Sequence, residues 1–268
     1  MITGNNHIRK KFYQKKQENE NFLQVLNSTL NKNEKSFYLK NLKEFPCIHI
    51  IGAPRSGTTL LAQLLSYCLS CGYIDSIAAR FWLSPVYGLK LSKSIFGCYD
   101  DLPLSLGSHY GVSNEPNGIH EFGYFWRHWL KRDSFSRSLG KIDWNELKLT
   151  VLNMQHTVGG PICFKNFYAS LVLEEFHKTF PKSIFIWIDR DPFDSMVSIL
   201  NARRSLYNDV SCWWSYAPPN YNKIKSLSPH GQILNQVFYL RNLFQNKFDK
   251  ISWKNCYRFD YKDVCSNG

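Results

Sequence analysis

The stretch GAPRSGTT is close to a phosphate-binding loop of the pattern G-x-x-x-x-G-K-[ST]. Gly52 and Gly57 stand at the required spacing, and Thr59 fills the last position. Thr58 replaces the lysine of the pattern, while Arg55 supplies a cation three residues earlier. Because that lysine normally reaches the terminal phosphates of a nucleoside triphosphate, its replacement favours a shorter anion that binds without Mg²⁺.

A second group of polar side chains lies in IDRDPFDSMVSIL. Arg190 ends an apolar run, and Ser198 follows eight residues later, about two turns into the expected helix. In a parallel sheet, the carboxyl end of a strand and the start of the next helix face the ligand crevice. Arginine also suits bidentate contact with phosphate. The spacing predicts a second phosphate contact near the loop; the plainer alternative is a capped helix with Arg190 in a structural ion pair.

Both groups stand where buried strands are expected to end. Strands are predicted for the apolar runs FPCIHIIGAP, PICFKNF, KSIFIWIDR and NCYRFDY. Helices are predicted for TTLLAQLLSYCLS, YASLVLEEFHKTF, DPFDSMVSILNARR and residues 230–247. Asp191 is expected to cap its helix, with Pro192 at the first helical position. This alternation predicts an α/β fold of the P-loop type, with three layers and a central parallel sheet flanked by helices.

The remaining sequence divides into an arm and an insertion. Residues 1–44 are rich in lysine and asparagine and predict a basic, helical N-terminal arm. Residues 45–268 are interpreted as a single α/β domain. Within it, the aromatic-rich residues 73–150 predict an insertion or lid on the acceptor side, whose aromatic side chains serve as lid or core, or line an acceptor pocket.

Composition limits the partners. The chain of 268 residues carries a formal net charge of +12, and 44% of its residues are hydrophobic. This predicts a globular protein with an anionic partner, such as a nucleic acid, a membrane surface or a phosphorylated or sulfated small molecule. A polar N-terminus and the lack of an apolar run of about 18 residues predict a cytoplasmic protein without a membrane span. The cysteines lack paired zinc-site spacing, and H-E-x-x-H is missing, so no metal is expected.

Taken together, PRSGTTLL and the downstream RDPFDSMVSIL resemble the sulfotransferase superfamily, whose donor is 3′-phosphoadenosine 5′-phosphosulfate (PAPS). FKNFYASLVLEEFHKTFPKSIFIWIDRDP and FDYKDV are also similar to family segments, so the resemblance spans about residues 46–264. It implies that the 5′ end of the donor is held by Arg55, Ser56, Gly57, Thr58 and Thr59. It also implies that Arg190 and Ser198 hold the 3′-phosphate, and that Lys165 neutralises the transferring group.

The resemblance further implies in-line transfer of a sulfuryl group to a hydroxyl or amine, with a general base taking the proton. Glu121 and His120 are the favoured bases, because EPNGIHEFGYFW is similar to a segment of bacterial relatives. Asp75 stands at about the spacing of a catalytic glutamate in tyrosylprotein-type members. A structural role is the alternative for each. Further possible bases lie in the same aromatic-rich stretch: His109, Glu115 and His128.

Several alternatives stay open. The acceptor is a carbohydrate, a lipid, a peptide tyrosine or another small molecule. A P-loop kinase-like enzyme is opposed by the missing loop lysine and by the lack of an obvious Walker-B aspartate. A non-catalytic, basic nucleotide- or nucleic-acid-binding protein is favoured by the charge and by the basic residues within 9–16, although the leading interpretation expects no nucleic acid. Relatives usually have a further helix after the FDYKDV-like segment, whereas this sequence has seven residues after Tyr261.

Overall fold

The computed structural model of the chain describes residues 9–11, 14–69, 71–97, 107–113, 115–133, 135–251 and 254–267. In this part, one five-stranded sheet has the order β2-β5-β1-β6-β7, and every neighbouring pair is parallel. Its strands are β1 (Cys47–Ile51), β2 (Gly72–Tyr73), β5 (Ile162–Lys165), β6 (Ile184–Asp189) and β7 (Cys256–Asp260). A separate antiparallel pair consists of β3 (Ser108–His109) and β4 (Val112–Ser113). The predicted parallel sheet is confirmed; β2 was not predicted, because two residues are too short to show a strand period.

Helices account for most of the remaining regular structure. The α-helices are α1 (Gln17–Glu34), α2 (Thr58–Cys68), α3 (Pro85–Phe96), α4 (Gly123–Trp129), α5 (Trp144–Val158), α6 (Leu173–Thr179), α7 (Pro192–Tyr207), α8 (Tyr221–Ile224), α9 (Pro229–Phe248) and α10 (Tyr261–Asn267). Turns of 3₁₀-helix occupy Lys35–Phe37, Ala78–Arg80 and Tyr168–Val172. The single helix predicted for YASLVLEEFHKTF is therefore divided, because Val172 leaves the helical conformation before α6 begins. Among the described helices, none is long and apolar enough to cross a membrane.

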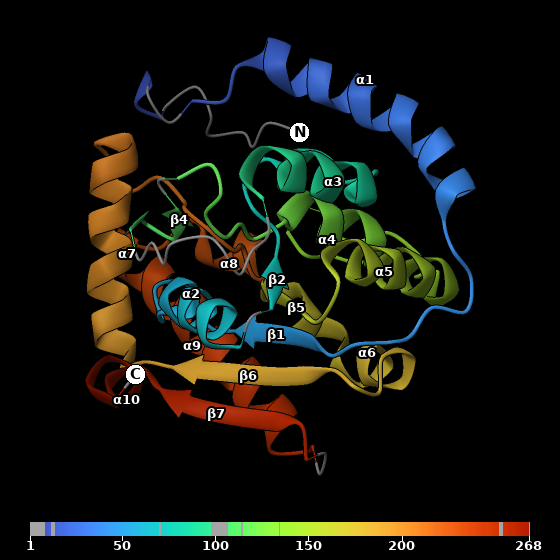
Figure 1. Cartoon of the computed structure of the whole chain (residues 1–268). Coiled ribbons are helices and arrows are strands. Elements are labelled where there is room, and N and C mark those ends of the chain that lie inside the picture. Colours follow the sequence, from blue (N-terminus) through green and yellow to red (C-terminus); the bar gives the residue numbers. More distant parts are fainter. Residues whose placement is uncertain are drawn as a thin grey trace.

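The side chains of the central strands alternate between two apolar cores. On β1, Cys47 and Ile51 belong to one buried cluster, whereas Ile48 and Ile50 belong to the other. The first cluster includes residues of α4, α5, α6 and α9, and the second includes residues of α2 and α10. A strand that is buried on both faces shows this period of two. The three predicted layers are therefore present, with helices on both faces of the sheet (Figure 1).

The carboxyl ends of β1 and β6 lie side by side in the middle of the sheet (Figure 1). From β1 the chain passes to β2 at one edge of the sheet, and from β6 it passes to β7 at the other edge. Such a reversal of direction opens a crevice beyond the strand ends. The two polar motifs follow β1 and β6, so the topology brings both to this crevice.

The aromatic-rich stretch contributes to the core as well as to the surface. It starts at Tyr73 of the edge strand β2, and its helix α4 and the first part of α5 place Trp126 and Leu147 in the larger core cluster. The predicted arm forms helix α1, which lies across α3 and α4 (Figure 1). Asn27 connects α1 to this stretch, because its amide donates to the carbonyl of Arg80 and accepts from the N–H of Leu83. A role of the stretch as a lid stays a prediction.

Candidate functional site

The loop between β1 and α2 has a backbone that suits a bound anion. Arg55 and Gly57 have positive φ angles of 70° and 97°. No side chain of the described residues caps the start of α2, so its first N–H groups remain available to an anion. A Cβ at Gly57 would lie 2.4 Å from the Tyr261 ring, which leaves room only for glycine. The Ser56 hydroxyl is buried and has no hydrogen-bond partner in the described part of the chain.

Two hydrogen bonds join this loop to the segment after β6. Nε of Arg55 donates to Oγ of Ser198 at 2.8 Å, and Nη1 of Arg190 donates to the carbonyl of Arg55 at 2.9 Å. The Arg190 guanidinium also lies 4.4 Å from the centroid of the Tyr261 ring. Burial, and after it the charge of Arg190, lowers the pKa of Arg55. We call Arg55, Arg190 and Ser198 the anion rim, because it gathers positive charge that an anion would relieve.

Local sequence explains the position of Arg190. Asp191 caps α7 by accepting from two N–H groups of the first turn, and Pro192 occupies the first helical position, as predicted. Asp189 ends β6 and is paired with Arg241 and Arg258 at 3.0 and 2.7 Å. These ion pairs occupy the Asp189 carboxylate. Arg190 itself lies with Nε 3.9 Å from Oδ2 of Asp194 on α7, which is the kind of ion pair that the plainer alternative expected.

Lys165 ends β5 and is almost completely buried, at 2% exposure. Its ammonium donates to Oγ1 of Thr59 at 3.1 Å and to the carbonyl of Gly111 at 2.7 Å. Oε1 of Glu121 lies 3.5 Å from the same nitrogen. Burial lowers the pKa of Lys165, and the Glu121 carboxylate opposes that change. A buried cation between the loop and a carboxylate can stabilise charge that develops on a transferring group.

Glu121 and His120 differ in their availability as bases. The Glu121 side chain is 64% exposed. The N–H of Phe122 donates to Nδ1 of His120 at 2.9 Å, which leaves the proton of the neutral ring on Nε2. His120 as a whole residue is exposed, but desolvation by the protein around its ring, and after it the Lys165 ammonium, lowers the pKa of His120 to about 4. A neutral His120 can therefore donate a proton in a hydrogen bond, while Glu121 is the better placed proton acceptor.

Asp75 is not among the groups around Lys165. One of its oxygens accepts from the N–H groups of Ile77 and Ala78 at 2.9 and 2.8 Å, and the Ser92 hydroxyl donates to the other. The residue is 1% exposed, and burial raises the pKa of its carboxyl. Asp75 thus holds the start of the 3₁₀ turn Ala78–Arg80, which fits the structural alternative.

Comparison with known proteins shows the family of the chain. A family model described as "Sulfotransferase family" matches residues 46–267. The chain belongs to the sulfotransferase family. Sulfuryl transfer is therefore its class of reaction, as the resemblance of the motifs implied.

Solved sulfotransferases have a similar fold. The crystal structure of one from Mycobacterium tuberculosis H37Rv is 16% identical in sequence with a TM-score of 0.60, over 94% of this chain and 73% of that chain. One from Mycobacterium avium is 17% identical with a TM-score of 0.55, over 90% of this chain and 64% of that chain. No protein of curated function matches the sequence of this sulfotransferase.

Two residues at the site of this sulfotransferase, Tyr110 and Gly111, were not predicted from the sequence. Tyr110 lies with its ring 5.4 Å from the Arg55 guanidinium, and the carbonyl of Gly111 accepts from Lys165. They form a turn in an irregular stretch, where no periodic pattern marks them. The contact of Tyr261 with Arg190 had a signal, because Tyr261 belongs to the family-like FDYKDV segment.

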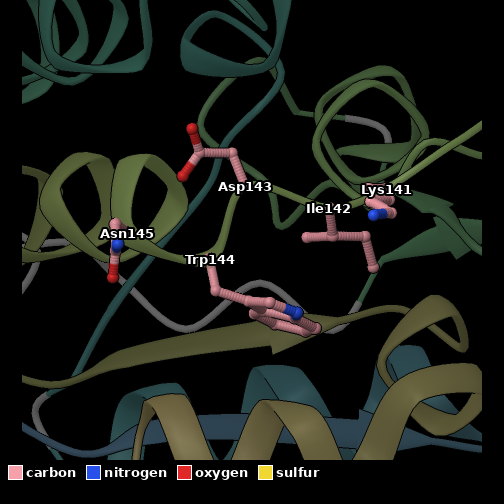
Figure 2. A pocket seen from close by; sticks show the side chains of 5 residues that line it. All are labelled: Lys141, Ile142, Asp143, Trp144 and Asn145. Carbon is pink, nitrogen blue, oxygen red and sulfur yellow. The ribbon is translucent and has the colours of Figure 1, made fainter.

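A separate hollow of this sulfotransferase lies at the start of α5 (Figure 2). It is lined by Lys141, Ile142, Asp143, Trp144 and Asn145. Asp143 caps α5 by accepting from the N–H of Glu146 and points away from the Trp144 ring (Figure 2). The hollow includes no residue of the anion rim, so we do not assign it to the reaction. Across the described ranges, no group of three or more His, Cys, Asp or Glu side chains is arranged to hold a metal ion.

Proposed function

We propose that this sulfotransferase uses PAPS as its donor and holds the nucleotide across the anion rim. The observation that carries the proposal is the pair of hydrogen bonds from Arg55 to Ser198 and from Arg190 to the Arg55 carbonyl. They connect residues that are 143 and 135 positions apart in the sequence. The loop after β1 and the segment after β6 each suit one anionic group. A nucleotide with a 5′-phosphosulfate and a 3′-phosphate would match both sides.

The loop supplies donors for the 5′ end. The N–H groups at the start of α2, together with Thr58 in its first turn, would contact the phosphosulfate. The buried Ser56 hydroxyl has no other partner among the described residues and would donate to the same group. Arg190 and Ser198 would contact the 3′-phosphate. No Mg²⁺ is required, because a single phosphosulfate lacks the β- and γ-phosphates that a metal bridges in nucleoside triphosphates.

In the proposed reaction, an acceptor oxygen or nitrogen attacks sulfur in line with the bond to the 5′-phosphate oxygen. That S–O bond breaks, 3′,5′-adenosine bisphosphate leaves, and the acceptor proton passes to Glu121. Lys165 would stabilise negative charge on the sulfuryl and leaving oxygens. His120 would donate a hydrogen bond from Nε2. Hydroxyl groups of carbohydrates, lipids and other small molecules are the acceptors to screen.

Titration calorimetry with 3′,5′-adenosine bisphosphate, 5′-AMP and Mg-ATP tests the donor. The bisphosphate should bind about 10- to 100-fold more tightly than 5′-AMP, because its 3′-phosphate makes hydrogen bonds between charged groups. The Arg190→Ala variant should lose this preference while its affinity for 5′-AMP stays the same. Arg204→Ala, on the exposed surface of α7, is the matched control and should bind as the wild type does. Equal affinities for the bisphosphate and 5′-AMP would contradict the proposal, and preferential Mg-ATP binding would favour the kinase-like alternative.

A further inference from the structure

The hairpin formed by β3 and β4 reaches into the site with its two-residue turn, Tyr110–Gly111. The pairing of His109 with Val112 defines this turn. Both turn residues have positive φ angles, 51° at Tyr110 and 84° at Gly111. Such a turn matches the twist of the flanking strands, but its first position usually holds asparagine, aspartate or glycine. A tyrosine there adopts a conformation that bulky residues seldom adopt, so its side-chain contacts must favour it.

Tyr110 contacts Arg55 of the anion rim and the helix α7, which carries Ser198. Its ring lies 5.4 Å from the guanidinium carbon of Arg55, within the range of a cation–π contact. Its hydroxyl donates to the carbonyl of Asn201 on α7 at 3.5 Å. The ring also meets Trp214 edge-on, with centroids 6.4 Å apart. The tyrosine therefore bridges the loop after β1 and the helix that carries Ser198.

Gly111 engages the buried lysine at the same time. An ammonium group has three N–H donors, and Lys165 has three oxygen neighbours: the Thr59 hydroxyl at 3.1 Å, the Gly111 carbonyl at 2.7 Å and Glu121 at 3.5 Å. Two of these contacts are hydrogen bonds and the third is an ion pair. An oxygen of a donor molecule would therefore compete with these partners for Lys165.

The hairpin is the partner that can leave at the lowest cost. Thr59 is buried in the first turn of α2, which packs on the sheet. Glu121 is the proposed proton acceptor and must stay close to the reacting atoms. Gly111 belongs to a pair of two-residue strands, and an isolated two-stranded hairpin is marginally stable.

We propose that the Tyr110–Gly111 turn is a gate on the donor site, which closes over Arg55 and Lys165 and is displaced when the donor binds. The Gly111 carbonyl takes the place of an anionic oxygen on Lys165, and the Tyr110 ring covers Arg55. The gate rests on the proposed function, because the ligand that displaces it is the PAPS-type nucleotide.

Hydrogen exchange at short labelling times, with and without 3′,5′-adenosine bisphosphate, separates the two proposals. We expect slower exchange in peptides covering residues 55–61 and faster exchange in peptides covering residues 107–113. Slower exchange at 55–61 with unchanged or slower exchange at 107–113 overturns the gate and leaves the donor assignment intact. Lack of a change at 55–61 overturns the donor assignment itself.

The Tyr110→Ala variant tests the same gate through affinity. Without the ring on Arg55 the gate should open more often, so the apparent affinity for the bisphosphate should rise by about 3- to 10-fold. Tyr110→Phe keeps the ring and should change the affinity less. Tyr67→Ala, at an exposed position of α2, is the matched control and should leave it unchanged. Circular dichroism checks that each variant is folded. Unchanged or weaker binding by folded Tyr110→Ala overturns the gate.

Discussion

Arg55 and Arg190 follow the strands β1 and β6, and Lys165 ends the neighbouring strand β5. His120 and Glu121, by contrast, stand in an irregular segment before α4. The register of the parallel sheet places the three cations, because the strand ends are adjacent. The His120–Glu121 segment depends instead on a few local contacts, among them the hydrogen bond from the His120 N–H to the Ile74 carbonyl at 2.7 Å. The proposed binding half of the site is thus built into the sheet, and the proposed proton-accepting half is attached to it.

An aromatic cluster around His49 joins the two halves. His49 lies on β1 just before the loop, and its ring is stacked between Phe164 of β5 and Phe185 of β6, with centroids 5.5 and 5.3 Å away. Trp126 of α4 meets the same ring edge-on. Neither ring nitrogen of His49 has a hydrogen-bond partner in the described part of the chain. The helix that follows the His120–Glu121 segment is therefore positioned by packing against the central strands.

The largest effect is expected on kcat, and it should distinguish the carboxylate of Glu121 from that of Asp75. Glu121→Gln should lower kcat by about 10²- to 10⁴-fold, because it removes the proposed base, and should leave the affinity for 3′,5′-adenosine bisphosphate unchanged. Asp75→Asn is the matched comparison; it should lower Tm, because it weakens the hydrogen bonds of a buried turn, but preserve the rate per folded molecule. Rates with labelled PAPS and a screened acceptor, together with thermal unfolding, measure both. A large loss of kcat in folded Asp75→Asn would reverse the two roles.

A smaller effect, on bisphosphate affinity, should distinguish the loop glycine Gly57 from a glycine at an ordinary helix end. Gly57→Ala and Gly159→Ala both place a side chain at a positive φ, which costs about 1–2 kcal/mol of stability. Only at position 57 does the new Cβ meet the Tyr261 ring; at Gly159 the space is open. Calorimetry should therefore show about tenfold weaker bisphosphate binding for Gly57→Ala, from about 1.4 kcal/mol of added strain in the loop. Equal affinities of the two variants would show that the loop tolerates the contact.

The smallest effect is expected on stability, at the aromatic cluster around His49 that joins the two halves of the site. Burial lowers the pKa of His49 to about 3 from the ordinary value of 6.5, so the unfolded chain binds a proton that the folded chain does not bind between these values. Stability should therefore fall as the pH decreases from about 6.5 toward about 3. His49→Phe should flatten this dependence and raise the free energy of unfolding at pH 7 by about 1 kcal/mol, because two buried nitrogens lack partners. Urea unfolding at pH 7 and pH 5 measures this, with the exposed His156→Phe as control. An unchanged pH slope in His49→Phe would assign the dependence to other groups.

The strand–loop–helix order, the Asp191 cap and the position of the two polar motifs at strand ends were predictable from the sequence. The surroundings of the acidic residues were not. Asp75 and Glu121 both stand in the same irregular stretch, and only burial separates them: Asp75 is 1% exposed and hydrogen-bonded, while the Glu121 side chain is 64% exposed beside Lys165. No local pattern encodes that difference, because it arises from which segment packs over the sheet. Tyr110 illustrates the same limit, since its partners Arg55 and Asn201 lie far away in sequence.

Local physics therefore specifies the backbone of the proposed anion cradle. The cradle needs a buried strand, then a glycine at a positive φ, then the start of a helix. These are properties of neighbouring residues, so they can be predicted from the local sequence. Other features of the site depend on contacts between distant segments. These are the hydrogen bond from Arg55 to Ser198, and the contact of the Tyr110–Gly111 turn with Arg55 and Lys165. Those contacts exist only after the parallel strands have aligned their carboxyl ends, and that alignment is a property of the folded sheet.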